Sequence, residues 1–166
     1  SDLSRPLDMK PRVSIDGNLV NQLYNMGSFS DQMLVHENAV LRVEEEIPFE
    51  VLALLGCGVT TGLGAVLNTA KITAGSTVVV IGCGGVGLSC IQGAVLGGAG
   101  RIIAIDIIDN KLDWARKIGA TDILNANHAD IVQEVKELTN GGAEFTFEAI
   151  GNKNTCEQAF EMLAPG

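Results

Sequence analysis

The chain has 166 residues, enough for one full domain or for one domain and a piece of another. Its 46% hydrophobic content supports a packed core, whereas its net charge of -9 disfavours nucleic acid, because phosphate binding needs clustered lysines and arginines. No run of about 18 apolar residues indicates a membrane span, and no basic and then apolar leader indicates export, so we expect a cytoplasmic protein without a membrane partner.

The first part of the chain carries weak structural signals. Residues 1–28 mix Asn, Gly, Pro and Ser without a clear period. The segment 28–43 predicts two short strands around an Asx-type turn at Glu37-Asn38, and residues 44–46 form an acidic run that we expect to be solvated. This region therefore predicts short strands joined by loops.

An apolar helical region follows. Pro48 is expected at a helix entry, and residues 49–55 are apolar enough to predict a buried helical turn. After the glycine-rich Gly56-Cys57-Gly58, residues 60–71 predict a helix that leads into the first strand of a sheet.

From Thr77 onward, strand and helix patterns alternate. The predicted strands cover residues 77–81, 101–106, 122–124 and 144–148. The predicted helices cover residues 85–97, 110–118, 129–139 and 154–163, with Asp109 and Asn154 as plausible caps. This alternation predicts an α/β fold of the Rossmann type, a doubly wound parallel sheet with helices on both faces. Two complete halves would need six strands, so we expect an incomplete sheet whose fourth strand is an exposed edge.

The first of these strands runs directly into the sequence GCGGVG at 82–87, which has the spacing G-x-G-x-x-G. Gly82 permits a tight turn, Gly84 lets the backbone approach a pyrophosphate, and Gly87 lets the following helix pack closely on the sheet. The next strand ends in Asp106, about 20 residues further on, where an acidic residue binds ribose hydroxyls. Strand, helix and acid together indicate a dinucleotide site; the alternative is a glycine-rich turn that binds nothing.

Asp106 also predicts which dinucleotide is bound. A carboxylate at this position repels a 2′-phosphate, and the following Ile107-Ile108-Asp109 contains no arginine that would accommodate one. The sequence therefore favours NAD over NADP.

Several motifs occur in order around the glycine loop. They are GCGVTTGLG at 56–64, AIDIIDNK at 104–111, KIGATDILN at 117–125 and NGGAEFTFEAIGN at 140–152. With GCGGVG, they resemble the zinc-dependent medium-chain alcohol dehydrogenases over nearly all of residues 28–166. The resemblance implies an oxidoreductase in which a catalytic zinc polarises an alcohol and hydride passes to NAD.

The resemblance also implies roles for single residues. Cys57 corresponds to the last of three protein ligands of the catalytic zinc. Thr61 and Val86 correspond to residues at the nicotinamide, and Lys111 to a basic residue near the adenosine ribose. The remaining expected coenzyme contacts are Gly82, Gly84, Gly85, Gly87, Asp106, Ala149 and Ile150, with Gly151 at the end of the same cleft segment. The other cysteines, Cys83, Cys90 and Cys156, are expected to be packing residues.

The zinc site implied by the family is incomplete in this chain. The family's first two zinc ligands, a cysteine and a histidine, come from a region N-terminal to these residues, and neither His36 nor His128 falls at the histidine's position. One cysteine is not a zinc site, because such sites usually need at least three protein ligands. We therefore expect a fragment that is inactive alone.

The expected domains follow from the same resemblance. Residues 1–58 would be the trailing part of a GroES-like catalytic domain, and residues 59–166 an NAD-binding domain truncated at its C-terminal end. The intact enzyme would act on a small alcohol or aldehyde and form a homo-oligomer. An NAD-binding module or structural fragment without catalysis is the alternative.

Overall fold

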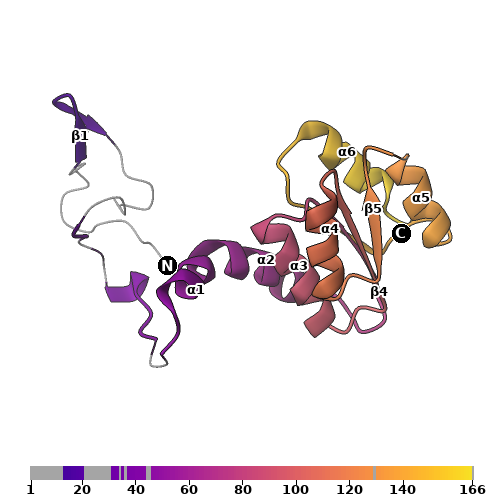
Figure 1. The fold of residues 1–166 in the computed structure, drawn as a ribbon, viewed down its shortest axis with the longest axis horizontal. Coiled ribbons are helices and arrows are strands. Elements are labelled where there is room, and N and C mark those ends of the chain that lie inside the picture. Colours follow the sequence, from indigo (N-terminus) through magenta and orange to yellow (C-terminus); the bar gives the residue numbers. More distant parts are fainter. Residues whose placement is uncertain are drawn as a thin grey trace. The chain divides into compact units, whose positions relative to one another are not determined.

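The computed structural model describes residues 13–20, 31–33, 35, 37–43, 46–128 and 130–165. The chain divides into two compact units at Glu46 and Ile47. The first unit contains a hairpin in which β1 (Val13–Ile15) pairs antiparallel with β2 (Asn18–Val20) (Figure 1). Asp16 and Gly17 turn the chain with φ values of 50° and 79°, as a type I′ turn requires at both central residues. The Asp-Gly pair predicts such a turn, so this hairpin was detectable in a segment where we expected no period.

The prediction of two strands between residues 28 and 43 is wrong, because the described residues of this segment form no strand. The expected turn is instead a 3-10 helix, η2 (Glu37–Ala39), closed by the amide of Val40 donating to the carbonyl of Glu37 at 3.3 Å. Residues 31–33, 35 and 40–43 are not in strands. A two-stranded ribbon is marginal without a buried face, and Val40 and Leu41 are exposed. Residues 1–12, 21–30, 34, 36 and 44–45 lie outside the described residues.

The second unit begins with a 22-residue helix, Phe49–Ala70. Its segments are α1 (Phe49–Leu54), the π-helical η3 (Leu55–Val59), α2 (Thr60–Gly64) and the π-helical η4 (Ala65–Ala70). Pro48 precedes it as the N-cap, as predicted, and Lys71 ends it in a left-handed conformation.

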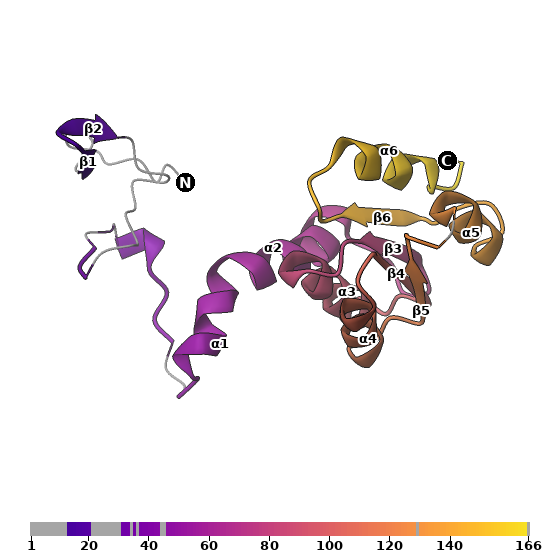
Figure 2. The same ribbon diagram turned by 45° about the horizontal axis from the view of Figure 1, so that its top comes forward.

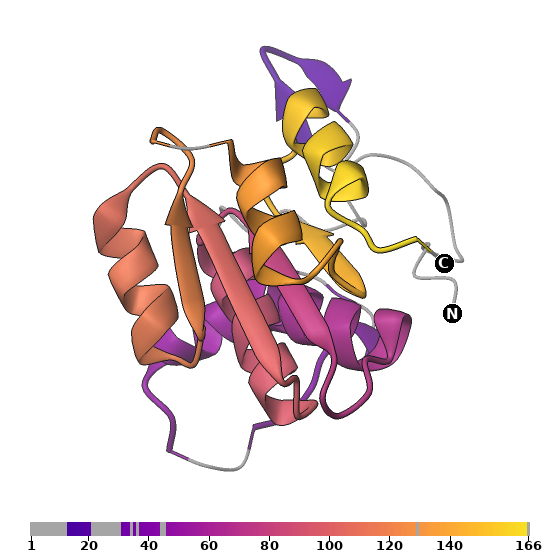
Figure 3. The ribbon, with the colours of Figure 1, turned by 90° about the vertical axis from the view of Figure 1, so that its right-hand side faces the viewer.

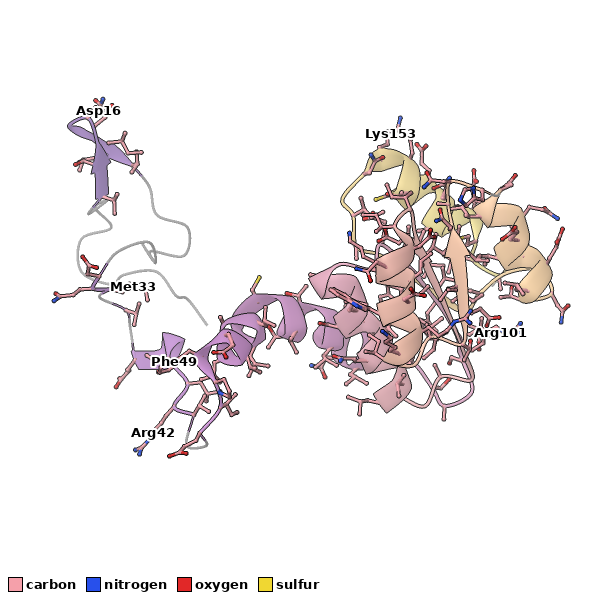
Figure 4. The ribbon with its side chains drawn as sticks, viewed as in Figure 1. Asp16, Met33, Arg42, Phe49, Arg101 and Lys153 are labelled. Atoms are coloured by element: carbon pink, nitrogen blue, oxygen red, sulfur yellow. The ribbon has the colours of Figure 1, made fainter. Side chains whose placement is uncertain are left out.

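The buried turn predicted for residues 49–55 is helical but not buried. No residue of α1 is buried, and Phe49 is 87% exposed on this helix (Figure 4). Within the described chain, Phe49–Ala70 is also the one helix whose length and composition would suffice to cross a membrane. That criterion is weak, because helices of soluble proteins meet it as well.

The sheet has four parallel strands, β3 (Thr77–Ile81), β4 (Arg101–Asp106), β5 (Asp122–Asn125) and β6 (Phe145–Glu148). Their order is β5-β4-β3-β6, with β6 at an edge as predicted (Figure 2). The chain thus reverses its direction of winding between β3 and β6, where doubly wound sheets bind their ligands. A parallel bridge between Ala143 and Leu163 adds a short contact beyond these strands.

Helices cover both faces of the sheet (Figure 3), which confirms the predicted Rossmann-type fold. They are α3 (Gly85–Leu96), α4 (Asp109–Lys117), α5 (Ile131–Leu138) and α6 (Lys153–Glu161). Because successive strand residues point to opposite faces, two cores form. One contains Val78, Val80, Ile102 and Ala104 with α3 and α4 residues, and the other contains Val79, Ile81, Ile103 and Ile105 with α5 and α6 residues.

Two predicted helix caps are displaced. Asp109 is the first residue of α4 rather than its cap, and its carboxylate accepts a hydrogen bond from Asn125. Helix α6 begins two residues earlier than the predicted cap implies, since the side chain of Asn152 accepts the amide of Asn154 at 2.8 Å. In both cases several polar residues precede the helix, and the one with the correct backbone geometry cannot be identified from spacing.

Candidate functional site

The glycine loop connects β3 to α3 at the carboxyl edge of the sheet. Gly82 has φ +94°, a conformation that other residues rarely adopt, and its amide donates to the carbonyl of Ile105 at 2.7 Å. A Cβ at Gly87 would overlap the carbonyl oxygen of Gly82, so α3 starts closer to β3 than any side chain allows. Gly84 is the N-cap of α3 and supplies no capping side chain. The loop therefore leaves amides at a helix N-terminus available to an anion.

Asp106 lies beside this loop at the end of β4 and is 7% exposed. Its Oδ2 accepts the amide of Cys83 at 2.8 Å, and its Oδ1 accepts the amides of Ile107 and Ile108. The Nζ of Lys111 lies 3.9 Å from Oδ2. These contacts offset the cost of burying the carboxylate and join the glycine loop to β4.

The segment after β6 forms the other side of the site. The amide of Ala149 donates to the carbonyl of Ile81 at 2.9 Å, which places this segment next to the end of β3. The side chain of Ile150 packs over the glycine loop, because a Cβ at Gly82 would lie 2.6 Å from its Cγ1. The three segments that we predicted to bind a coenzyme thus meet at the carboxyl edge of the sheet.

A cavity of about 400 Å³ opens beyond the carboxyl ends of the strands, a size within the usual range for small-ligand sites. Its walls combine apolar side chains with the carboxylates of Asp106 and Asp130 and the polar side chains of Thr155 and Gln158. The lining residues are Ile81, Ile105, Asp106, Ile107, Ala126, Asp130, Ile131, Ile150, Thr155 and Gln158.

Sequence reasoning named only Asp106 and Ile150 among these residues as coenzyme contacts. Of the others, Ile81, Ile105 and Ile107 lie at the ends of β3 and β4. The rest come from the chain after β5, the start of α5 and the first turns of α6. The available signal was the rule that ligands bind outside the carboxyl ends of the strands, which applies to β5 as much as to β3 and β4.

Helix α2 adjoins the start of α3. Gly62 is buried there, and a Cβ at this position would meet the carbonyl oxygen of Val86 and the side chain of Ser89. Thr61 is the neighbouring residue and is exposed, while Val86 is half-buried. The close packing at Gly62 therefore brings the helix that carries Thr61 to the end of the glycine loop.

Cys57 lies in η3 and is exposed. The hydroxyl of Thr60 donates to its carbonyl oxygen at 3.1 Å. Among the residues that the structure describes, no three His, Cys, Asp or Glu side chains are grouped as a metal site would need. His128 is exposed, and His36 lies outside the described residues. The described donor set does not fit a zinc ion, and no chemical step through zinc follows from it.

The remaining cysteines differ in burial. Burial and the charge of Asp106 raise the pKa of Cys83 to about 12, although Lys111 opposes the shift, and burial raises the pKa of Cys90 to about 11. Both are protonated packing residues at neutral pH, as predicted. Cys156, predicted to be in the core, is exposed instead, and the buried residue of α6 is Ala159.

Comparison with known proteins agrees with this geometry. The family model of the zinc-binding dehydrogenases matches residues 85–166. The class-3 alcohol dehydrogenase of Oryza sativa subsp. japonica is 42% identical over 161 residues, which cover 96% of this chain and 42% of the rice protein. A probable S-(hydroxymethyl)glutathione dehydrogenase of Schizosaccharomyces pombe is 44% identical over 147 residues, covering 87% of this chain and 39% of that protein.

A solved structure shows the same relationship. The benzyl alcohol dehydrogenase of Acinetobacter calcoaceticus superposes with a TM-score of 0.81 at 38% identity, over 85% of this chain and 39% of that one. The chain therefore spans about two fifths of the length of these relatives. Taken with the glycine loop, Asp106 and the strand order, these similarities show that the chain belongs to the zinc-dependent medium-chain alcohol dehydrogenase family.

Proposed function

We propose that this chain supplies the coenzyme-binding part of an NAD-dependent zinc alcohol dehydrogenase, in which hydride passes between an alcohol and NAD. The observation that carries the proposal is that the glycine loop, Asp106 and the segment after β6 meet at the carboxyl edge of the sheet, where Asp106 and Ile150 also line a cavity. That arrangement offers an anion site, a hydroxyl acceptor and a pocket of mixed polarity for the three parts of a dinucleotide: phosphate, ribose and base.

The residues would divide the coenzyme between them as follows. The amides at the start of α3 would bind the pyrophosphate, with Gly84 and Gly85 leaving room for its approach. Asp106 would accept the ribose hydroxyls, with Lys111 near the same carboxylate, and the cavity would hold the adenine. Thr61, Val86 and Ala149 would lie toward the nicotinamide. Bound NAD would supply the hydride acceptor.

Asp106 supports a preference for NAD over NADP. Its carboxylate is buried and already accepts three amides, so it cannot turn away from a 2′-phosphate without breaking those hydrogen bonds. Lys111 offsets only part of that charge, since its Nζ lies 3.9 Å away.

The zinc site and the domain limits remain proposals. Cys57 would supply one zinc ligand and other parts of the intact enzyme the rest, so we expect no turnover from these residues alone. Residues 1–58 would belong to the catalytic domain and residues 59–166 to the coenzyme domain. The second candidate function, a module that binds NAD without catalysis, predicts the same binding but no zinc-dependent activity in the intact protein.

We further propose a small alcohol or aldehyde as substrate, a cytoplasmic location and a homo-oligomeric enzyme without a nucleic-acid or membrane partner. Relatives named for S-(hydroxymethyl)glutathione and for benzyl alcohol both match the chain, so the similarity does not identify the alcohol that is oxidised. Among the described residues β6 is an edge strand, so its outer side can pair with a further strand, which favours association.

Titration calorimetry with NADH and NADPH tests the proposal. We expect NADH to bind at least about tenfold more tightly, a difference of about 1.4 kcal/mol. Equal binding of both coenzymes would refute Asp106 as the selector, and no binding of either would refute the proposed function. Alcohol oxidation by this chain at the rate of an intact relative would contradict the expected lack of turnover.

A further inference from the structure

We propose that Glu148 is a positioning residue for the adenosine half of the coenzyme. It acts through Ile150 and Thr155, because its carboxylate accepts the backbone amide of Ile150 and the hydroxyl of Thr155. This inference rests on the proposed function, because it concerns the same cavity. Glu148 is the last residue of β6 and is half-buried.

The carboxylate of Glu148 accepts hydrogen bonds from two successive elements. Its Oε1 accepts the amide of Ile150 at 2.9 Å and that of Gly151 at 3.0 Å, both in the segment after β6. The same oxygen accepts the hydroxyl of Thr155 at 2.8 Å, in the first turn of α6. One carboxylate therefore joins the end of β6, the segment that follows it and the start of α6.

Two of these partners line the cavity. Ile150 and Thr155 are both lining residues, whereas Glu148 is not. Ile150 is also the side chain that packs over Gly82, so its position sets the distance between the glycine loop and the segment after β6. Loss of the hydrogen bonds to Glu148 would free one wall of the cavity without removing any atom that touches a ligand.

The charge of Glu148 suits this role. Burial raises its pKa, but the hydrogen bonds from Thr155, Gly151, Ile150 and Cys156 outweigh burial and hold the pKa below its usual value. The group is therefore an anion at neutral pH and accepts every one of these donors. A glutamine has one acceptor oxygen and an NH₂ group, so it cannot satisfy the same set of donors.

Cys156 provides an independent reporter of this network. Its thiol lies 3.6 Å from Oε2 of Glu148 and is exposed. Desolvation, the negative charge of Glu148, that hydrogen bond and the charge of Glu157 all raise the pKa of the thiol. Removal of the charge should lower this pKa and accelerate alkylation, because the thiolate is the reactive form.

The test compares Glu148→Gln with Glu161→Gln, which makes the same charge change at the exposed end of α6. ADP-ribose and NADH are titrated onto each variant of this chain, and iodoacetamide alkylation of Cys156 is followed by peptide mass spectrometry, with the exposed Cys57 as internal reference. For Glu148→Gln we expect both ligands to bind about tenfold more weakly and Cys156 to react faster than in the wild type. Glu161→Gln should change neither measurement.

A second variant keeps the charge. Glu148→Asp retains the anion on a shorter side chain, so it should lose the hydroxyl of Thr155 and weaken ADP-ribose binding by about threefold. This variant carries the test if Glu148→Gln does not fold. If folded Glu148→Gln shows faster alkylation of Cys156 but binds ADP-ribose within about twofold of the wild type, the inference is overturned and the proposed function stands. Unchanged ADP-ribose affinity in folded Glu148→Asp would overturn it as well. Failure of the wild-type chain to bind either ligand would overturn both.

Discussion

The strands β3 and β4 and the helix α1 are all strongly apolar, yet only the strands are buried. Val78, Val79 and Val80 are fully inaccessible in β3, whereas α1 contains no buried residue and Leu54 is 62% exposed. The strands differ because β4 and β6 pair with β3 on either side and helices cover both faces. An apolar segment therefore gives its helix or strand an apolar face, but that face is buried only where another element covers it.

We expect the largest effect to be the difference in unfolding free energy between alanine substitutions of a buried and an exposed leucine. Leu112 in α4 is 2% exposed and Leu54 in α1 is 62% exposed. Leu112→Ala should lower the free energy of unfolding by about 2–5 kcal/mol, because it removes buried methyl groups and leaves a cavity. Leu54→Ala should change it by less than about 0.5 kcal/mol. Urea unfolding followed by circular dichroism measures both, and equal losses would show that α1 is covered in solution.

The next effect concerns the glycine loop. Gly87→Ala places a methyl group on the carbonyl oxygen of Gly82, so the loop or α3 must move. We expect a loss of about 3 kcal/mol in unfolding free energy, as for other overpacked sites, and a loss of NADH binding. Gly64→Ala is the control, because that helical glycine has no atom closer than 4.0 Å to the added carbon. A Gly87→Ala chain that binds NADH normally would show that the close approach is not needed.

A smaller effect should appear at Asp106. Asp106→Asn removes the charge that opposes a 2′-phosphate, and we expect the preference for NADH over NADPH to fall from at least about tenfold to about threefold or less. Asp113→Asn makes the same charge change at an exposed position of α4 and should leave the preference unchanged. If both variants keep the wild-type preference in calorimetry, another group selects the coenzyme.

The smallest effect is the pH dependence that Glu148 contributes. Although burial opposes the shift, the hydrogen bonds from Thr155, Gly151 and Ile150 hold its pKa in the folded chain below the usual value. The group therefore adds stability above the unfolded pKa, and that stability is lost as the pH falls through the folded pKa. The difference in unfolding free energy between wild type and Glu148→Gln should be constant at neutral pH and shrink below about pH 4.5. A difference that grows on acidification would contradict this assignment.

Much of the sheet was predictable from local sequence. Strands β3 and β4 match their predicted limits, because each is a run of β-branched residues bounded by polar residues or glycine. The exposure of α1 was not predictable, since periodicity does not say which element covers a face. The hairpin at β1 and β2 was missed although Asp16-Gly17 indicated it.

The candidate site was predictable only where a residue's role depends on its own segment. The backbone demands on Gly82 and Gly87, and the position of Asp106 at a strand end, are local properties. The lining contributed by Ala126 and Thr155 depends on the strand order, which brings the chain after β5 and the start of α6 to one cavity. Glu148 was missed for the same reason, since its hydrogen bonds join segments whose proximity the sequence does not state.

The central claim is that this chain binds NAD(H) at the carboxyl edge of its sheet. Amide NMR spectra recorded during an NADH titration test it most directly. The account predicts chemical-shift changes concentrated at residues 82–87, 106–108 and 149–151, with little change at β1, β2 and α1. Changes confined to the helix Phe49–Ala70, or no changes at saturating NADH, would contradict it.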